Sequence, residues 1–235
     1  MAHRLLAVLV ATGLFRVAPS GADEWPAPEP VSFVCRGFSY VAEVFPPKSR
    51  QNPGERPLCY FYQVGYPGRA WKVDARLRWK AELTKDADNP MPYRALVSMD
   101  GHLVTMNDLT GGDPKHSVAI YSPGGKFVKS YGLREILPKE AAPFLPMSGW
   151  TREATFYFLE KPARLYIIPV GGRTGKAMEF MLADGAFRSG DLKNFPDAAK
   201  LIEAKRESNA KTEIWATSLR FSSITDVLAA KMACE

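Results

Sequence analysis

Two histidines and two aspartates lie close together near the middle of the chain. His102 and His116 flank a segment that contains Asp108 and Asp113. Imidazole and carboxylate groups can together bind a divalent metal ion, and a bound ion could activate water for hydrolysis. The spacing matches neither the HExxH pattern nor an EF-hand loop. We therefore favour a hairpin loop that uses Asp and Gly for turn geometry, and we keep a metal-dependent hydrolase as the alternative.

Other catalytic patterns are incomplete in this sequence. Ser98, Asp100 and His102 are close together, but on a strand-turn-strand they would not form a relay without a distorted backbone. Glycosidase chemistry needs two carboxylates, and nothing in the sequence pairs Glu160 with Glu179. We expect Glu179 to lie exposed on an extended strand, opposite a Lys or Arg of the neighbouring strand. No catalytic residue and no cofactor is therefore assigned.

The first 22 residues have the pattern of an export signal. A short basic start is followed by an apolar run of about 11 residues, against roughly 18 for a membrane-spanning helix. Small residues precede the expected cleavage after Ala22, so the mature chain would begin at Asp23. The alternative is an uncleaved anchor, since Arg16 is unusual in a signal. We expect an exported protein, periplasmic or extracellular, with no transmembrane segment once the signal is removed.

Three cysteines would then meet an oxidising compartment, where disulfides persist. A bond between Cys35 and Cys59 would close a loop of about 25 residues, worth about 3 kcal/mol in the chain-entropy model. Cys234 would then remain unpaired, but three pairings of these cysteines are possible and the sequence alone does not choose among them. The alternative is that all three are reduced and fill space as small apolar side chains.

The formal net charge is +6, and basic residues alternate with acidic ones rather than forming runs. A nucleic-acid surface needs Lys and Arg clustered on one face, so no nucleic-acid partner is expected.

Most of the remaining sequence has residue patterns typical of short β-strands. After a Pro-rich leader at 23–32, a β-rich domain is expected over 33–192, and a helical segment over 193–235. The clearest strand is Trp71–Leu83, in which Trp71, Leu77 and Trp79 are expected on one dry face. In the last segment, Asp197 can cap a helix, whereas Ile214–Phe221 could be helix or strand.

The segments Ala95–Thr105 and Val118–Tyr131 together resemble a β-propeller blade of the TolB-like type. The shared features are the S-x-D-G turn at Ser98–Gly101, a hydrophobic-Tyr strand and a Gly turn before the last strand. This resemblance implies a four-stranded antiparallel meander. The mature chain also resembles a group of exported bacterial proteins of unassigned function, on the stretch Ser98–Thr105 and on Ile136–Pro138. We therefore expect a mainly β fold of antiparallel meanders, either a partial propeller or another antiparallel sheet fold.

Aromatic residues cluster in one short part of the chain, at Tyr60, Phe61, Tyr62, Tyr66 and Trp71. Alternation places at least half of them in the core, and the others could form a binding platform. The sequence thus favours an exported, non-enzymatic binding or scaffold protein of the cell envelope. Its partner would be a protein or an envelope glycan.

The export signal is testable by mass spectrometry of the protein recovered from periplasm or medium. We expect a chain that begins at Asp23, and we expect Leu9→Arg to block export by interrupting the apolar run. Recovery of a chain that still carries residues 1–22 would show an anchor instead.

Overall fold

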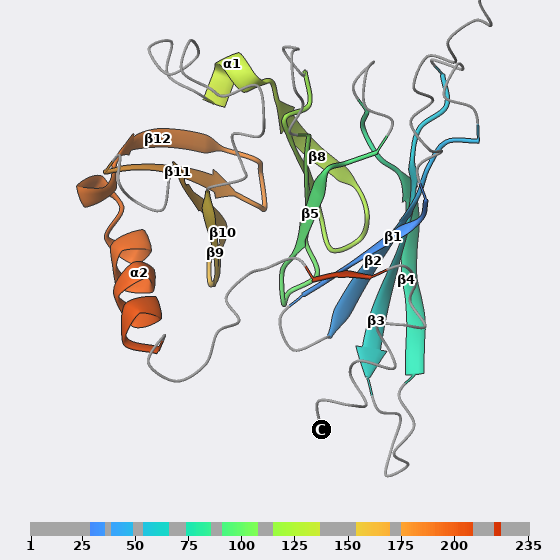
Figure 1. Cartoon of the computed structure of the whole chain (residues 1–235), viewed down its shortest axis with the longest axis horizontal. Coiled ribbons are helices and arrows are strands. Elements are labelled where there is room, and N and C mark those ends of the chain that lie inside the picture. Colours follow the sequence, from blue (N-terminus) through green and yellow to red (C-terminus); the bar gives the residue numbers. More distant parts are fainter. Residues whose placement is uncertain are drawn as a thin grey trace, which may run out of the picture.

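Three antiparallel β-sheets stack face to face, and a helix covers the outer face of the third sheet (Figure 1). The computed structural model describes residues 29–35, 39–48, 54–65, 74–85, 91–107, 115–136, 154–169, 175–208 and 219–221. The expectation of a mainly β fold built from antiparallel meanders is confirmed.

The first sheet contains four consecutive strands and one strand from the end of the chain. These are β1 (Val31–Val34), β2 (Tyr40–Phe45), β3 (Leu58–Gly65), β4 (Asp74–Glu82) and β13 (Leu219–Phe221). The order is β13-β1-β2-β3-β4, so β13 pairs with β1. The stretch Ile214–Phe221 therefore contributes a strand. The segment 193–235 is not wholly helical, because its residues 219–221 complete the edge of the first sheet.

The middle sheet is a four-stranded meander in sequence order. Its strands are β5 (Arg94–Val97), β6 (Leu103–Met106), β7 (Val118–Tyr121) and β8 (Phe127–Tyr131), and the short helix α1 (Leu133–Ile136) follows. The arrangement agrees with the strand runs and Gly turns expected between Ala95 and Tyr131.

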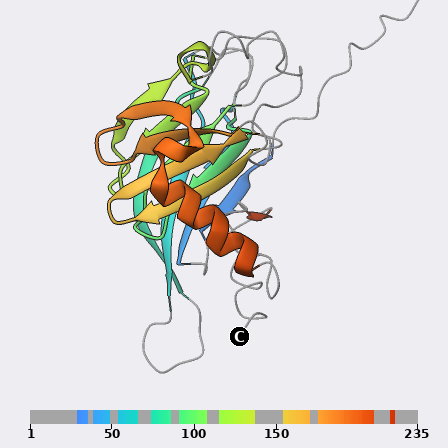
Figure 2. The same cartoon turned by 90° about the vertical axis from the view of Figure 1, so that its left-hand side faces the viewer.

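The third sheet is a second four-stranded meander, ordered β12-β11-β10-β9. Its strands are β9 (Thr155–Glu160), β10 (Ala163–Ile168), β11 (Lys176–Met181) and β12 (Phe187–Asp191). A short 3-10 helix, η4 (Leu192–Asn194), leads into α2 (Pro196–Ser208), which is the helix expected from Asp197 onward. Figure 2 shows α2 lying across the strands of this sheet.

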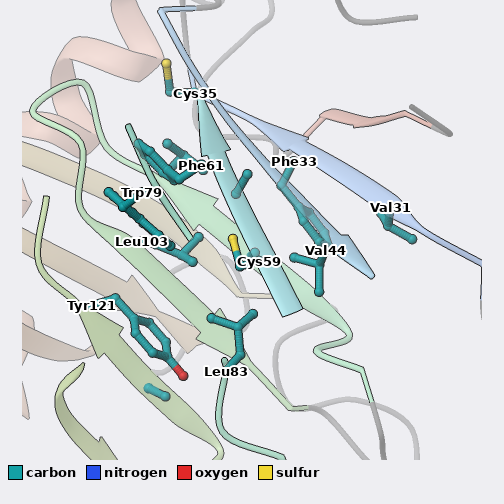
Figure 3. Close-up of a cluster of buried hydrophobic side chains, with 14 of the residues drawn as sticks. Val31, Phe33, Cys35, Val44, Cys59, Phe61, Trp79, Leu83, Leu103 and Tyr121 are labelled. Carbon is teal, nitrogen blue, oxygen red and sulfur yellow. The ribbon is translucent and has the colours of Figure 1, made fainter. Parts of the chain in front are cut away.

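The middle sheet is buried on both faces, and every residue of β6 and β7 is buried. Ala95, Val97, Leu103, Ala119 and Tyr121 pack against the first sheet (Figure 3). The opposite face packs against the third sheet through Leu96, Val104, Met106, Val118 and Ile120. Each large apolar side chain buried in this way contributes about 1.5–3 kcal/mol to the free energy of folding. The burial of two faces explains why these strands are almost continuously apolar.

Two turn glycines fix how closely neighbouring sheets approach. A Cβ added to Gly125, in the β7–β8 turn, would lie 2.7 Å from the ring of Trp79 on β4. A Cβ added to Gly185, in the β11–β12 turn, would lie 2.6 Å from Cβ of Lys129 on β8. Both glycines have positive φ, +78° and +72° respectively. The β7–β8 turn of the middle sheet therefore contacts β4 of the first sheet, and the β11–β12 turn of the third sheet contacts β8 of the middle sheet.

A bulge in β4 changes which face Leu77 occupies. Phe61 pairs with Trp79, but the next residue, Tyr62, pairs with Leu77, so Arg78 is an extra residue in β4. Neighbouring residues of β3 point to opposite faces, and so must their partners. The expectation that Leu77 shares the dry face of Trp79 is therefore wrong. Trp79 is 8% exposed, whereas Leu77 is 49% exposed.

The Gly125 contact predicts a substitution with a matched control. Gly125→Ala adds a methyl group against Trp79 and puts Ala at positive φ, so we expect the free energy of unfolding to fall by about 2–4 kcal/mol. Gly175 also has positive φ, +61°, but nothing lies within 4 Å of an added Cβ. Gly175→Ala should therefore cost only about 1 kcal/mol, the cost of the backbone conformation. Equal losses in urea unfolding would show that the Trp79 contact does not limit the approach of the sheets.

Candidate functional site

Ser98, Asp100 and His102 form one hydrogen-bonded turn between β5 and β6. The Ser98 hydroxyl donates to the Asp100 carboxylate, and His102 Nδ1 lies 2.9 Å from Asp100 Oδ1. The His102 backbone N–H donates to Ser98 Oγ at 2.8 Å. Hydroxyl and imidazole thus both bind the carboxylate, whereas nucleophilic catalysis needs the hydroxyl to donate to the base. The three side chains and the His102 backbone thus hold the turn.

The structure does not bring the two candidate metal-binding histidines together. His102 precedes β6 and His116 precedes β7, and these strands pair antiparallel with Leu103 opposite Tyr121 and Met106 opposite Val118. The histidines therefore lie at opposite ends of the strand pair, on the order of 13 Å or more apart. His116 Nδ1 lies instead 2.8 Å from the Ser130 hydroxyl. One ion cannot bind both histidines.

The other two members of that set, Asp108 and Asp113, lie outside the described residues. Within the part of the chain that the structure describes, no group of three or more His, Cys, Asp or Glu residues is placed to hold a metal ion.

Glu160 and Asp100 form a carboxylate pair between the third and middle sheets. Glu160 ends β9 and accepts a hydrogen bond from the Met99 backbone N–H at 3.3 Å. Burial, and then the charge of Asp100, raise the pKa of Glu160. Burial also disfavours ionisation of Asp100, but hydrogen bonds from His102 and Ser98 outweigh it and lower the pKa of Asp100. The pKa of Asp100 therefore lies below that of Glu160, and Glu160 accepts a proton more readily as the pH falls.

Glu179 lies in a buried polar network beneath α2. The carboxylate accepts hydrogen bonds from the Tyr166 hydroxyl at 2.7 Å, from Arg164 Nη1 at 3.1 Å and from Arg188 Nε. Burial alone would raise the pKa of Glu179, but the bonds from Arg188 and Tyr166 outweigh it and lower that pKa. Arg164 also reaches Asp197, at the start of α2, at 3.3 Å. The network therefore ties the helix to the sheet.

The cross-strand arginine expected for Glu179 is present, because Arg188 lies opposite it on β12. The expectation that Glu179 is exposed is wrong: the residue is 2% exposed. Glu160 and Glu179 also point to opposite faces of the third sheet. Glu160 shares a side with Phe156 and Phe158, which face the middle sheet, whereas Glu179 pairs with Tyr166 on the face that α2 covers. The two carboxylates form no glycosidase pair.

Cys35 and Cys59 are buried in the same apolar cluster, and no disulfide joins these two described residues (Figure 3). The Tyr40 backbone N–H donates to Cys35 Sγ at 3.0 Å. Tyr40 lies opposite Gln63 on β3, four positions along from Cys59. Burial, followed by the charge of Glu43, raises the pKa of the Cys59 thiol far above its usual range, so this thiol is no nucleophile. Cys234 lies outside the described residues.

One surface of the first sheet carries aromatic side chains that are not part of the core. Tyr60 lies opposite Lys80 and Tyr62 opposite Leu77, so these four residues share the face away from Phe61 and the middle sheet. We call them the tyrosine face. Both tyrosines are half-buried and Leu77 is exposed. The Lys80 ammonium lies 5.0 Å from the centre of the Tyr60 ring.

The tyrosine face agrees in part with the aromatic platform considered from the sequence. Phe61 is core, 1% exposed, and stacks on Trp79 with ring centres 4.5 Å apart. Tyr66 and Trp71 lie outside the described residues. Strict alternation along the strand predicts Leu77 on the face of Trp79, so the sequence did not indicate that Leu77 belongs to the tyrosine face. The bulge at Arg78 places it there.

Comparisons of the chain with protein-family models, with curated proteins and with solved structures gave no match.

The carboxylate pair predicts opposite effects for two isosteric substitutions. Because the folded protein raises the pKa of Glu160, its ionised form costs stability at neutral pH, and this cost disappears as the pH falls through the raised pKa. Glu160→Gln should therefore raise the free energy of unfolding at pH 7, by less than about 1 kcal/mol because solvent screens both groups. The gain should shrink towards pH 4.

Asp100→Asn is the matched control in the same urea-unfolding measurement. The folded protein lowers the pKa of Asp100, so its ionised form stabilises the turn above the unfolded pKa. The substitution should reduce stability at pH 7. A destabilised Glu160→Gln variant at pH 7 would contradict the assignment of the two carboxylates.

Proposed function

We propose that this protein is an exported, non-enzymatic binding or scaffold protein of the cell envelope. The groups in its described residues that could do chemistry take part in structural contacts. His102 and Asp100 hold a turn, and Glu179 ties α2 to the third sheet. A binding role needs none of these groups, only a stable surface on a rigid support.

The observation that carries this proposal is the tyrosine face, on which Leu77 and Lys80 are exposed and both tyrosines are half-buried. Its strands, β3 and β4, belong to a sheet whose other face is tightly packed through Phe61 and Trp79. Tyrosine presents an apolar ring and a polar hydroxyl, a combination enriched at recognition surfaces. Leu77 adds a large apolar side chain that the bulge holds outward.

The proposed location follows from the sequence of residues 1–22, which lie outside the described residues. Among the described helices, none is long and apolar enough to span a membrane. The partner would be a protein or a glycan of the envelope. The mixed charge pattern of the chain supports no nucleic-acid partner.

In-cell cross-linking of the tagged protein, followed by affinity capture and mass spectrometry, tests the proposal. Leu77→Ser should reduce recovery of the captured partner or envelope polymer several-fold, because it removes an apolar contact of the tyrosine face. Tyr93→Ser is the matched control, since Tyr93 is 50% exposed and Leu77 is 49% exposed. Tyr93 precedes β5 and lies outside the tyrosine face.

Equal recovery with all three proteins would contradict a role for the tyrosine face. No enrichment from cells that express the protein well would contradict the binding function itself.

A further inference from the structure

We infer that residues 222–235 pack over the half of the first sheet's outer face that β1 and β2 form, with Lys231 paired to Glu43. These residues follow β13 and lie outside the described residues. The half of the face that they would cover consists of Ser32, Val34, Val41 and Glu43, and we call it the valine face.

Exposure changes along a row of paired residues that crosses the outer face of the first sheet. The row runs from β1 to β4 through Val34, Val41, Tyr62 and Leu77. Both valines are buried, Val41 with 0% exposure, whereas Tyr62 is half-buried and Leu77 is 49% exposed. The outer face is therefore covered over β1 and β2 and open over β4.

The neighbouring row has the same gradient. It runs through Ser32, Glu43, Tyr60 and Lys80. Ser32 is 0% exposed and Glu43 is 7% exposed, whereas Tyr60 is half-buried and Lys80 is exposed. Side chains on a bare sheet face keep contact with water, so another segment must lie over the valine face.

The described residues do not supply this cover. The middle sheet, the third sheet and α2 all lie on the other side of the first sheet (Figure 1). The apolar clusters of described residues include neither Val34 nor Val41. The buried Ser32 hydroxyl has no hydrogen-bond partner among the described residues. The cover therefore comes from a part of the chain outside them.

Residues 222–235 begin at the edge of the valine face. β13 ends at Phe221, which pairs with Ser32, and Ser32 pairs in turn with Glu43 on β2. Neighbouring strands are about 4.8 Å apart, so β2 lies about 10 Å from β13. A helix over 224–233, which Ser223 can cap, would be about 15 Å long. Such a helix is long enough to cross both β1 and β2.

The sequence of this segment forms one apolar stripe with a basic residue in it. Helical spacing from position 224 places five residues on one side, namely Ile224, Val227, Leu228, Lys231 and Met232. The opposite side carries alanines and Asp226. The apolar members of the stripe can pack on Val34 and Val41, and the Lys231 ammonium would then lie at the contact with the sheet.

The valine face carries the matching charge. A carboxylate buried beside valines, such as Glu43, is stabilised when the surface that covers it presents a cation. The leader at 23–28, which precedes β1, matches less well. Its charged residues, Asp23 and Glu24, are acidic, and its prolines oppose a helix.

Thiol labelling of the folded mature protein tests the cover. Val41→Cys places a thiol on the valine face, Leu77→Cys places one on the open part of the same row, and both variants also carry Cys234→Ser. In a chain that ends at Phe221, we expect the thiol at position 41 to react at least about tenfold faster than in the chain 23–235. The thiol at position 77 should react equally fast in both. Unreacted Cys59, which is 0% exposed, verifies that the shortened chain is folded.

Charge reversal in the chain 23–235 tests the pair without truncation. Lys231→Glu should raise the equilibrium constant for unfolding in urea about tenfold, because it places two carboxylates together on a buried surface. Lys200→Glu is the matched control at an exposed position of α2, and it should change that constant by less than about threefold. The double variant Glu43→Lys/Lys231→Glu should recover most of the loss.

Equal labelling of Val41→Cys in the two chains, with Cys59 unreacted, would overturn the inference. Faster labelling only in a chain that lacks residues 23–28 would also overturn it and assign the cover to the leader. If Cys59 reacts in the shortened chain, the charge reversals decide, and equal effects of Lys231→Glu and Lys200→Glu would overturn the inference. These measurements involve no partner, so their outcome is independent of the proposed binding function.

Discussion

Close packing of turn backbone against a neighbouring sheet is the constraint on which this structure depends. Gly125 rests on Trp79, Trp79 stacks on Phe61, and Phe61 stacks on Tyr40 with ring centres 5.6 Å apart. Tyr40 in turn lies beside Gly101, in the turn that contains Asp100. Whereas a Cβ at Gly101 would make only ordinary van der Waals contacts, a Cβ at Gly125 would clash with the Trp79 ring and push the β7–β8 turn away from the first sheet. The repeat of this contact at Gly185 extends the same packing to the third sheet, where β9 ends beside the Asp100 turn.

Sequence reasoning succeeded where the signals are local. The turns at Asp100-Gly101 and at Pro123–Gly125 need glycine for their backbone, and the strands between them are short apolar runs, so the middle sheet could be outlined from the sequence. Contacts between distant segments were beyond such reasoning. Leu77 lies on the face opposite Trp79 because Arg78 is an extra residue in the pairing of β4 with β3. Glu179 is buried because α2 packs over the face of the third sheet on which it lies. Both are properties of pairing and packing, which periodicity does not encode.

The polar groups that first suggest catalysis have a common structural role. Each links two segments: Asp100 closes its own turn and faces Glu160 of the third sheet, and Glu179 connects three strands to the helix. A buried carboxylate is costly unless it is fully hydrogen-bonded, and Glu179 has three donors around it. Such hydrogen-bonded networks favour one packing of the sheets and the helix over alternative packings that would bury as much apolar surface. The tyrosine face lies on the side of the first sheet away from these networks.

The bulge at Arg78 makes the composition of the tyrosine face depend on strand register as well as on residue type. If Arg78 paired with Tyr62 in one uninterrupted register, Leu77 would lie on the same side as Trp79. Loss of Arg78 would remove the bulge yet leave Leu77 opposite Tyr62, because Leu77 would then directly precede Trp79. In the gene, an in-frame loss of this one codon would therefore preserve the tyrosine face, whereas an exchange of the Leu77 codon would alter it.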